Sequence, residues 1–195
     1  MLTAFRRDWY LATFRRRFIE SRGNEFEDLI ASLCRIADPG FINPEPMGTH
    51  GDGGSDGLLD SGRTVHACYG SRAVSDMDRT MASKIKADFA RARSCWPGMR
   101  IWRFVTNSPV GRHGSQAILD LRLEQEQALP EQCVDIQLWQ TPDDVWRFVA
   151  ARASDNLLDI ELARLFPGCP SERSPQVAEL VPIIDRLSEG AQPVS

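Results

Sequence analysis

Acidic and glycine residues gather directly before a short apolar segment in the first half of the chain. Residues 51–57 read GDGGSDG and present Asp52 and Asp56. Carboxylate oxygens are the ligands that Mg²⁺ takes in proteins, and glycine, which lacks a Cβ, lets the backbone approach a phosphate closely. The stretch therefore indicates a metal or phosphate site, and the segment behind it decides whether further ligands are present.

The segment behind this loop, Arg63 to Tyr69, is expected to be a β-strand. Side chains alternate between the two faces of a strand, so Ala67 and Tyr69 share one face while His66 and Cys68 share the other. Alanine offers no ligand atom, and a tyrosine with an ordinary pKa of about 10 is neutral in water. Histidine and cysteine can bind a transition metal, but they are not the usual ligands of Mg²⁺.

The remaining elements follow from hydrophobic periodicity and turn residues. Helices are predicted around Phe26–Ile36, with Asn24 as the cap, and over residues 76–93 and 115–127. Another helix is predicted from Thr141, where a capping hydroxyl, a proline and two aspartates follow one another. Strands are expected at residues 41–45, 57–60, 63–69, 101–105 and 134–138.

This order of elements predicts an α/β fold with a central mixed sheet flanked by helices. We expect one α/β domain over residues 1–152, including the N-terminal helices. Residues 153–195 are expected to form a helical, proline-rich tail with an apolar segment from Val177 to Leu187. Such a tail is expected to wrap the domain or to dock a partner.

Charge and cysteine content limit the classes of function. The net charge is −4, but residues 1–37 carry seven arginines against five acids. A nucleic-acid face is therefore expected near the N-terminal helices, at Arg15, Arg16, Arg17 and Arg22. No apolar run approaches the roughly 18 residues of a membrane span, so no membrane partner is expected. The five cysteines form no CxxC pair, which fits a reducing cytoplasm.

The order of the helix GNEFEDL, the loop GDGGSDG and the strand TVHACYG resembles that of the PD-(D/E)XK nucleases. This is the restriction-endonuclease-like fold, and the Mrr-like branch is the most similar. In that family an acid at the end of one strand binds a divalent metal, and the next strand supplies an acid or Gln, any residue, and then Lys. The resemblance implies that Glu27 is the helical acid and Asp56 the metal-binding acid, both on Mg²⁺.

The strand departs from the family's pattern. In the preferred register Ala67 stands at the acid or glutamine position and Tyr69 at the lysine position. We therefore expect no tightly bound Mg²⁺ and a catalytic loss of several orders of magnitude. Lys84 or Lys86, the two lysines of the chain, could reach back from the next helix, as relocated lysines do in some members of this fold.

A narrower resemblance extends over residues 14–187. From FRRRFIESRGNEFEDL through KIKADF and WRFVTN to VPIIDRL, the chain is similar to the nuclease-like modules of bacterial multi-component anti-phage systems. In these modules a small residue or Gln, any residue, and Tyr replace the nuclease signature. The resemblance implies a subunit or recognition module that works with an ATPase and an effector.

Three hypotheses remain open from the sequence. The leading one is a non-catalytic nuclease-fold module for nucleic-acid sensing or complex assembly in bacterial defence. The second is an active Mg²⁺-dependent DNA endonuclease that uses Glu27, Asp56 and a relocated lysine. The third is a protein-interaction domain in which Glu27 is a solvated helix residue and Asp56 belongs to an ordinary turn.

Overall fold

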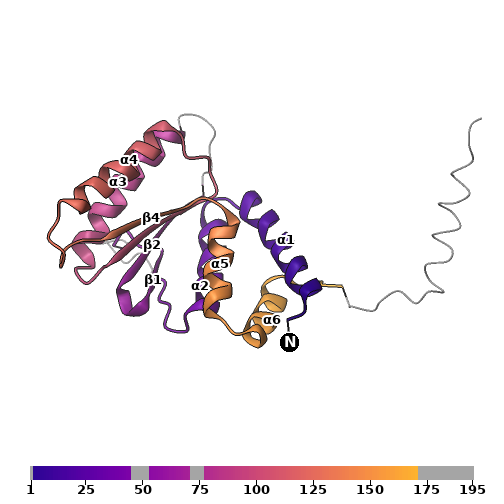
Figure 1. The fold of residues 1–195 in the computed structure, drawn as a ribbon. Helices are drawn as coiled ribbons and strands as arrows, with labels where there is room; N and C mark the ends of the chain where they lie inside the picture. The colour runs from indigo at the N-terminus through magenta and orange to yellow at the C-terminus, as the bar shows by residue number, and fades with distance from the viewer. Residues whose placement is uncertain (1, 45–52, 71–76, 171–195) are drawn as a thin grey trace, which may run out of the picture.

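A four-stranded mixed sheet forms the centre of the computed structural model, which describes residues 2–44, 53–70 and 77–170 (Figure 1). The strands lie in the sheet in chain order, and β1 is antiparallel to β2, whereas β2, β3 and β4 are parallel to one another. Their bounds are β1 Gly57–Leu59, β2 Thr64–Tyr69, β3 Ile101–Thr106 and β4 Asp135–Trp139. The predicted α/β class, with a central mixed sheet, is confirmed.

Helices cover both faces of this sheet (Figure 1). Helices α3 (Met77–Cys95) and α4 (Arg112–Glu126) lie together on one face. The other face carries α1 (Ala4–Glu20), α2 (Asn24–Ala37), α5 (Pro142–Arg152) and α6 (Asp155–Leu165). The chain therefore builds a helix layer, a sheet layer and a second helix layer, each helix burying one apolar side.

Alternation along the strands divides the buried side chains between two cores. Ala67 and Phe104 belong to the core beneath α3 and α4, whereas Cys68 and Val105 belong to the core beneath α1, α2, α5 and α6. This is the two-residue period of a strand that is buried on both faces. Tyr69 packs against the same core as Ala67, as the alternation predicts.

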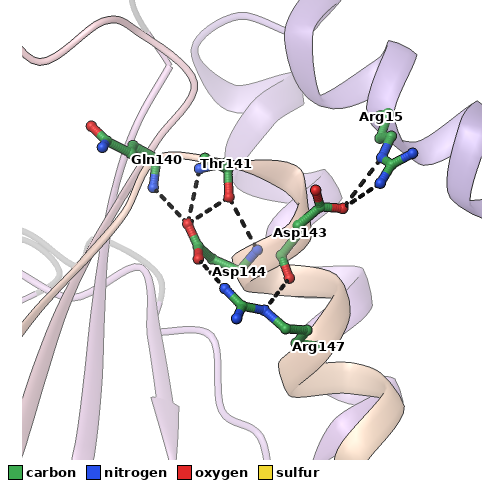
Figure 2. Close-up of polar contacts among 6 residues, drawn as sticks. All are labelled: Arg15, Gln140, Thr141, Asp143, Asp144 and Arg147. Atoms are coloured by element: carbon green, nitrogen blue, oxygen red, sulfur yellow. Dashed lines mark hydrogen bonds and ion pairs between the residues drawn. The ribbon is translucent and has the colours of Figure 1, made fainter.

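Helix α5 begins with the capping box that its sequence predicts (Figure 2). The Thr141 Oγ1 accepts a hydrogen bond from the backbone N–H of Asp144 at 3.3 Å, and Asp144 Oδ2 accepts one from the backbone N–H of Thr141 at 3.1 Å. Helix α2 begins differently from the prediction, because its cap is Gly23 and Asn24 is its first helical residue.

Of the strand predicted at residues 41–45, the structure describes residues 41–44, and there Ile42 forms a single bridge with Leu58. Helix α6, which the sequence assigns to the tail, packs its Leu158 and Leu162 into the core that α1 and α2 share. The apolar segment Val177–Leu187 lies outside the described residues. Among the helices that the structure describes, none is long and apolar enough to cross a membrane.

Candidate site at the end of strand β2

The glycines of the GDGGSDG loop bring the chain close to α3. Gly53 and Gly54 have φ angles of +68° and +70°, the left-handed region that favours glycine. A Cβ on Gly54 would lie 2.7 Å from the carbonyl oxygen of Asp88, and one on Gly53 would lie 3.2 Å from Nε1 of Trp96. The two glycines therefore let the loop pack on α3, whereas the sequence suggested that they admit a phosphate.

Asp56 follows this loop and is fixed to strand β2. Its backbone N–H donates to the carbonyl of His66 at 2.8 Å, and its Oδ2 accepts a hydrogen bond from the backbone N–H of Cys68 at 2.6 Å. The paired residues of β1 begin at Gly57, opposite His66, so Asp56 lies directly before the ladder and is bonded to β2 on both sides of Ala67, at His66 and Cys68.

Glu27 approaches the same strand from the first turn of α2. The N-cap of this helix, Gly23, donates its N–H to the carbonyl of Gly70 at 2.8 Å, directly after β2 ends. A Cβ on Gly70 would lie 2.7 Å from the Cβ of Phe26, so helix and strand are in close contact. Glu27, one residue further along, is half-buried at this contact.

Lys84 of α3 completes an acid–lysine cluster, which we define as Glu27, Asp56, Lys84 and Asp88. The Nζ of Lys84 lies 2.7 Å from Oδ2 of Asp88, and the Lys84 side chain is 35% exposed. Burial lowers the pKa of Lys84, but the hydrogen bond and charge of Asp88, together with the charges of Asp56 and Glu27, outweigh burial and raise that pKa. The lysine is therefore held in its charged form among these acids.

The thiol of Cys68 experiences the same charges. Its pKa is raised well above the ordinary value, first by burial and then by the charges of Asp56, Cys34 and Glu27, while Lys84 opposes the shift. The charges of Glu27, Asp56 and Lys84 therefore act on the side chain of Cys68 near the end of β2. Because only the thiolate is a good nucleophile or metal ligand, Cys68 is not prepared for either task.

The alternative pair of strand ligands, His66 and Cys68, is also poorly placed for a metal. The Nε2 of His66 lies 2.7 Å from Nη1 of Arg103, and its Nδ1 lies 3.7 Å from Sγ of Cys34. Both ring nitrogens therefore already face side chains of the core, and the ring is 1% exposed.

The structure distinguishes between the two lysines. The Nζ of Lys86 lies 3.0 Å from Oδ2 of Asp120 on α4, and the Lys86 side chain is 57% exposed. Lys86 thus faces α4, whereas Lys84 faces the acids. Asp88 was not singled out from the sequence, although its position four residues after Lys84 on a helix is a signal for an ion pair.

The strand positions of the nuclease signature hold packing residues. Ala67 is fully buried and has no ligand atom. The ring of Tyr69 stacks on Phe104 with centroids 6.3 Å apart, and its backbone carbonyl accepts a hydrogen bond from Oγ1 of Thr106 at 2.8 Å. Position 67 therefore contributes a methyl group, and position 69 a half-buried phenol, at the end of β2.

The donors that the structure describes do not complete a magnesium shell. Glu27 and Asp56 offer carboxylates, but Oδ2 of Asp88 is bound to the Lys84 ammonium. Within residues 2–44, 53–70 and 77–170, no group of three His, Cys, Asp or Glu side chains is placed to hold a metal ion. Asp52 lies outside these ranges. We therefore derive no reaction step through a metal at this site.

Two of the four arginines proposed for nucleic acid hold α1 against other parts of the chain. Nη2 of Arg15 lies 2.8 Å from Oδ1 of Asp143, at the start of α5 (Figure 2). Nη1 of Arg17 donates to the carbonyl of Leu165 at 3.2 Å, and its guanidinium lies over the ring of Phe166. Both arginines thus have a structural role in addition to any role toward phosphate.

The other two arginines have local partners. Arg16 lies 3.9 Å from Glu20, one turn further along α1, at the limit of an ion pair. Arg22 donates to the carbonyl of Ser21 at 2.7 Å and also to that of Ile19. Phosphate contact by these four arginines stays a prediction.

Comparison of the chain with protein-family models, curated proteins and solved structures finds no match.

Proposed function

We propose that this chain is a nuclease-fold module that binds nucleic acid without cutting it, and that it works with protein partners in a cytoplasmic bacterial defence complex. The observation that carries the proposal is the residue of β2 that lies between the two backbone contacts of Asp56. Ala67 is fully buried there and provides no ligand. A metal-dependent nuclease needs a second oxygen ligand at this point to hold the metal against the scissile phosphate.

The charges of the acid–lysine cluster support a role other than direct phosphate binding. Three carboxylates, those of Glu27, Asp56 and Asp88, accompany a single cation, Lys84. In the absence of a metal ion this cluster repels a phosphate. Nucleic acid therefore binds through cationic side chains elsewhere on the molecule, and the cluster stabilises the contact of α2, β2 and α3.

Binding at rising salt concentration tests this proposal. Labelled DNA and RNA, each single-stranded and double-stranded, are titrated with the full chain between about 50 and 200 mM salt. The proposal predicts an affinity whose logarithm falls linearly with the logarithm of the salt concentration, because bound cationic side chains release counterions. If none of the four nucleic acids binds at the low-salt end, the protein-interaction hypothesis replaces this one.

A second candidate function, an active Mg²⁺-dependent endonuclease, is favoured by one observation. The charges of Asp56 and Glu27 act on Lys84 strongly enough to contribute to its raised pKa, so a relocated lysine does accompany the two acids. This candidate predicts DNA cleavage that Lys84→Met abolishes and that Arg164→Met leaves intact. Arg164 is the control because it is a cation of similar length on α6, where it pairs with Glu161 on the surface.

A further inference from the structure

A groove of about 410 Å³ runs between α3 and α4, on the outer side of the helix layer. We call it the α3–α4 groove. Its polar lining consists of Arg79, Ser83 and Lys86 from α3 and His113, Gln116 and Asp120 from α4. The three α3 residues follow one another at intervals of four and three positions, so they form one stripe along that helix.

Hydrogen-bond donors dominate this lining. Arg79 and Lys86 carry positive charge, and His113 and Gln116 can each donate. Among the described residues, no carboxylate lies within ion-pair distance of Arg79, since Arg79 takes part in none of the salt bridges found there. The side chain of Lys86 is 57% exposed despite its ion pair, so its ammonium remains accessible from the groove.

The one acid in the lining already has both oxygens occupied. Oδ2 of Asp120 accepts from Nζ of Lys86 at 3.0 Å, and its Oδ1 accepts from Nε2 of Gln116 at 2.8 Å. Hydrogen bonds from Gln116 and Lys86 lower the pKa of Asp120, so it is ionised and neutralises one of the two cations.

Asp78, beside the groove, is occupied as well. Its Oδ2 and Oδ1 accept the backbone N–H groups of His113 and Gly114, each at 2.8 Å, at the start of α4. The positive end of the α4 dipole therefore faces this carboxylate and offsets its charge. An excess of positive charge remains in the α3–α4 groove, on the opposite side of α3 from the acids of the acid–lysine cluster.

We propose that the α3–α4 groove holds the phosphate backbone of nucleic acid, with Arg79 and Lys86 as its cationic contacts. This inference rests on the proposed function and names the surface that performs it. Phosphate oxygens accept hydrogen bonds from arginine, lysine and neutral donors alike, which matches the mixture of side chains in the groove. His113 and Gln116 supply the neutral donors, whereas the hydroxyl of Ser83 already donates to the backbone carbonyl of Arg79 at 3.0 Å.

The experiment compares two charge-matched double variants of the full chain. Arg79→Gln with Lys86→Gln removes both cations from the groove. Arg147→Gln with Arg164→Gln removes two cations from α5 and α6, where they pair with Asp144 and Glu161. Binding of a labelled DNA duplex is followed by fluorescence anisotropy at several salt concentrations, and thermal unfolding confirms that each variant is folded.

For the groove variant we expect the slope of log affinity against log salt to become shallower by about 1.8, since each lost phosphate contact removes about 0.9. The α5–α6 variant should bind with the slope of the unmodified chain. An unchanged slope in the groove variant overturns the inference while leaving the proposed function standing. Absence of salt-dependent binding by the unmodified chain overturns both.

As a third arm, Asp120→Asn should tighten binding, because it removes the negative charge from the groove.

Discussion

The backbone N–H of Cys68 donates a hydrogen bond to Oδ2 of Asp56 at 2.6 Å, which ties the glycine loop to the end of β2. A charged acceptor makes this a strong bond, and it holds the carboxylate in one orientation. Because Lys84 lies in the field of that carboxylate, the bond also fixes the electrostatic environment of the lysine. Two predictions follow from the position of Asp56 and its loop.

Asp56→Asn is expected to lower the pKa of Lys84. The amide oxygen can still accept from Cys68, but the negative charge that stabilises the ammonium is gone. Lys84 and Lys86 are the only lysines of the chain, so the two ¹³Cε signals of lysine-labelled protein can be resolved by NMR. The Lys86 signal, from the lysine that pairs with Asp120 on α4, is the internal reference. Identical titration of Lys84 in both proteins would show that Asp56 does not act on it.

Gly54→Ala is expected to destabilise the chain more than Gly62→Ala. Both glycines have positive φ, +70° and +80°, so both variants carry a left-handed penalty of about 1–2 kcal/mol. Only at Gly54 would the new methyl group lie 2.7 Å from the carbonyl of Asp88, whereas nothing lies within 4 Å at Gly62. We predict a loss of about 2–5 kcal/mol at Gly54, measured by urea unfolding. Equal losses would mean that the loop does not press on α3.

Much of the fold could be predicted from the sequence, because local signals decide where its elements lie. The capping box at Thr141 specified the start of α5, and strand alternation placed Ala67 and Tyr69 on the same side. The strand expected at residues 41–45 fails because only Ile42 pairs with β1. A short apolar run does not reveal how many of its residues find a partner strand.

The candidate site was less predictable, because it depends on packing between distant elements. Lys84 and Lys86 were equivalent in the sequence, and the rotation of α3 against the sheet decides that only Lys84 faces Asp56. Likewise, the sequence shows that Gly53 and Gly54 allow a close approach, but it does not show to what. The structure gives the answer, the backbone of α3 at Asp88.

Stability is expected to fall in mild acid because of His66. Burial, and after it the charges of Arg103 and Arg152, hold the pKa of His66 well below its ordinary value. Below about pH 6.5 the unfolded chain therefore binds a proton that the folded chain does not, until the low folded pKa is reached. The free energy of unfolding should fall by up to about 1.4 kcal/mol per pH unit in this range.

Urea unfolding of the full chain between neutral pH and about pH 5 measures this effect, over the range in which an ordinary histidine gains its proton. His66→Gln should flatten the pH dependence, since glutamine does not titrate. His113→Gln, which replaces an exposed histidine of α4, is the control for the substitution itself. Equal slopes in all three proteins would remove His66 as the cause.

Arg103→Met is expected to destabilise the core. Arg103 is 5% exposed, stacks on Trp139 with its Cζ 3.8 Å from the ring centroid, and donates to Oε1 of Gln137 at 2.9 Å. Methionine keeps most of the apolar contact but leaves the facing nitrogen of buried His66 without a donor, at about 1–3 kcal/mol for an unpaired buried group, and it removes the partner of the half-buried Gln137.

Arg164→Met is the matched control for this loss. Arg164 pairs with Glu161 on the surface, with 73% of its side chain exposed, so its replacement should change the free energy of unfolding by less than about 1 kcal/mol. Thermal or urea unfolding of both variants provides the comparison. If Arg103→Met is as stable as the control, the buried guanidinium is not needed to satisfy its neighbours.

The most direct measurement for the central claim is incubation of the purified chain with labelled linear and plasmid DNA in the presence of Mg²⁺ or Mn²⁺. Each sample is read twice, for binding by anisotropy and for strand breaks on a denaturing gel. With Ala67, which offers no ligand, between the two β2 contacts of Asp56, we predict DNA that is bound and remains intact. Metal-dependent strand breaks that disappear in Asp56→Ala would contradict this account and establish the chain as a nuclease.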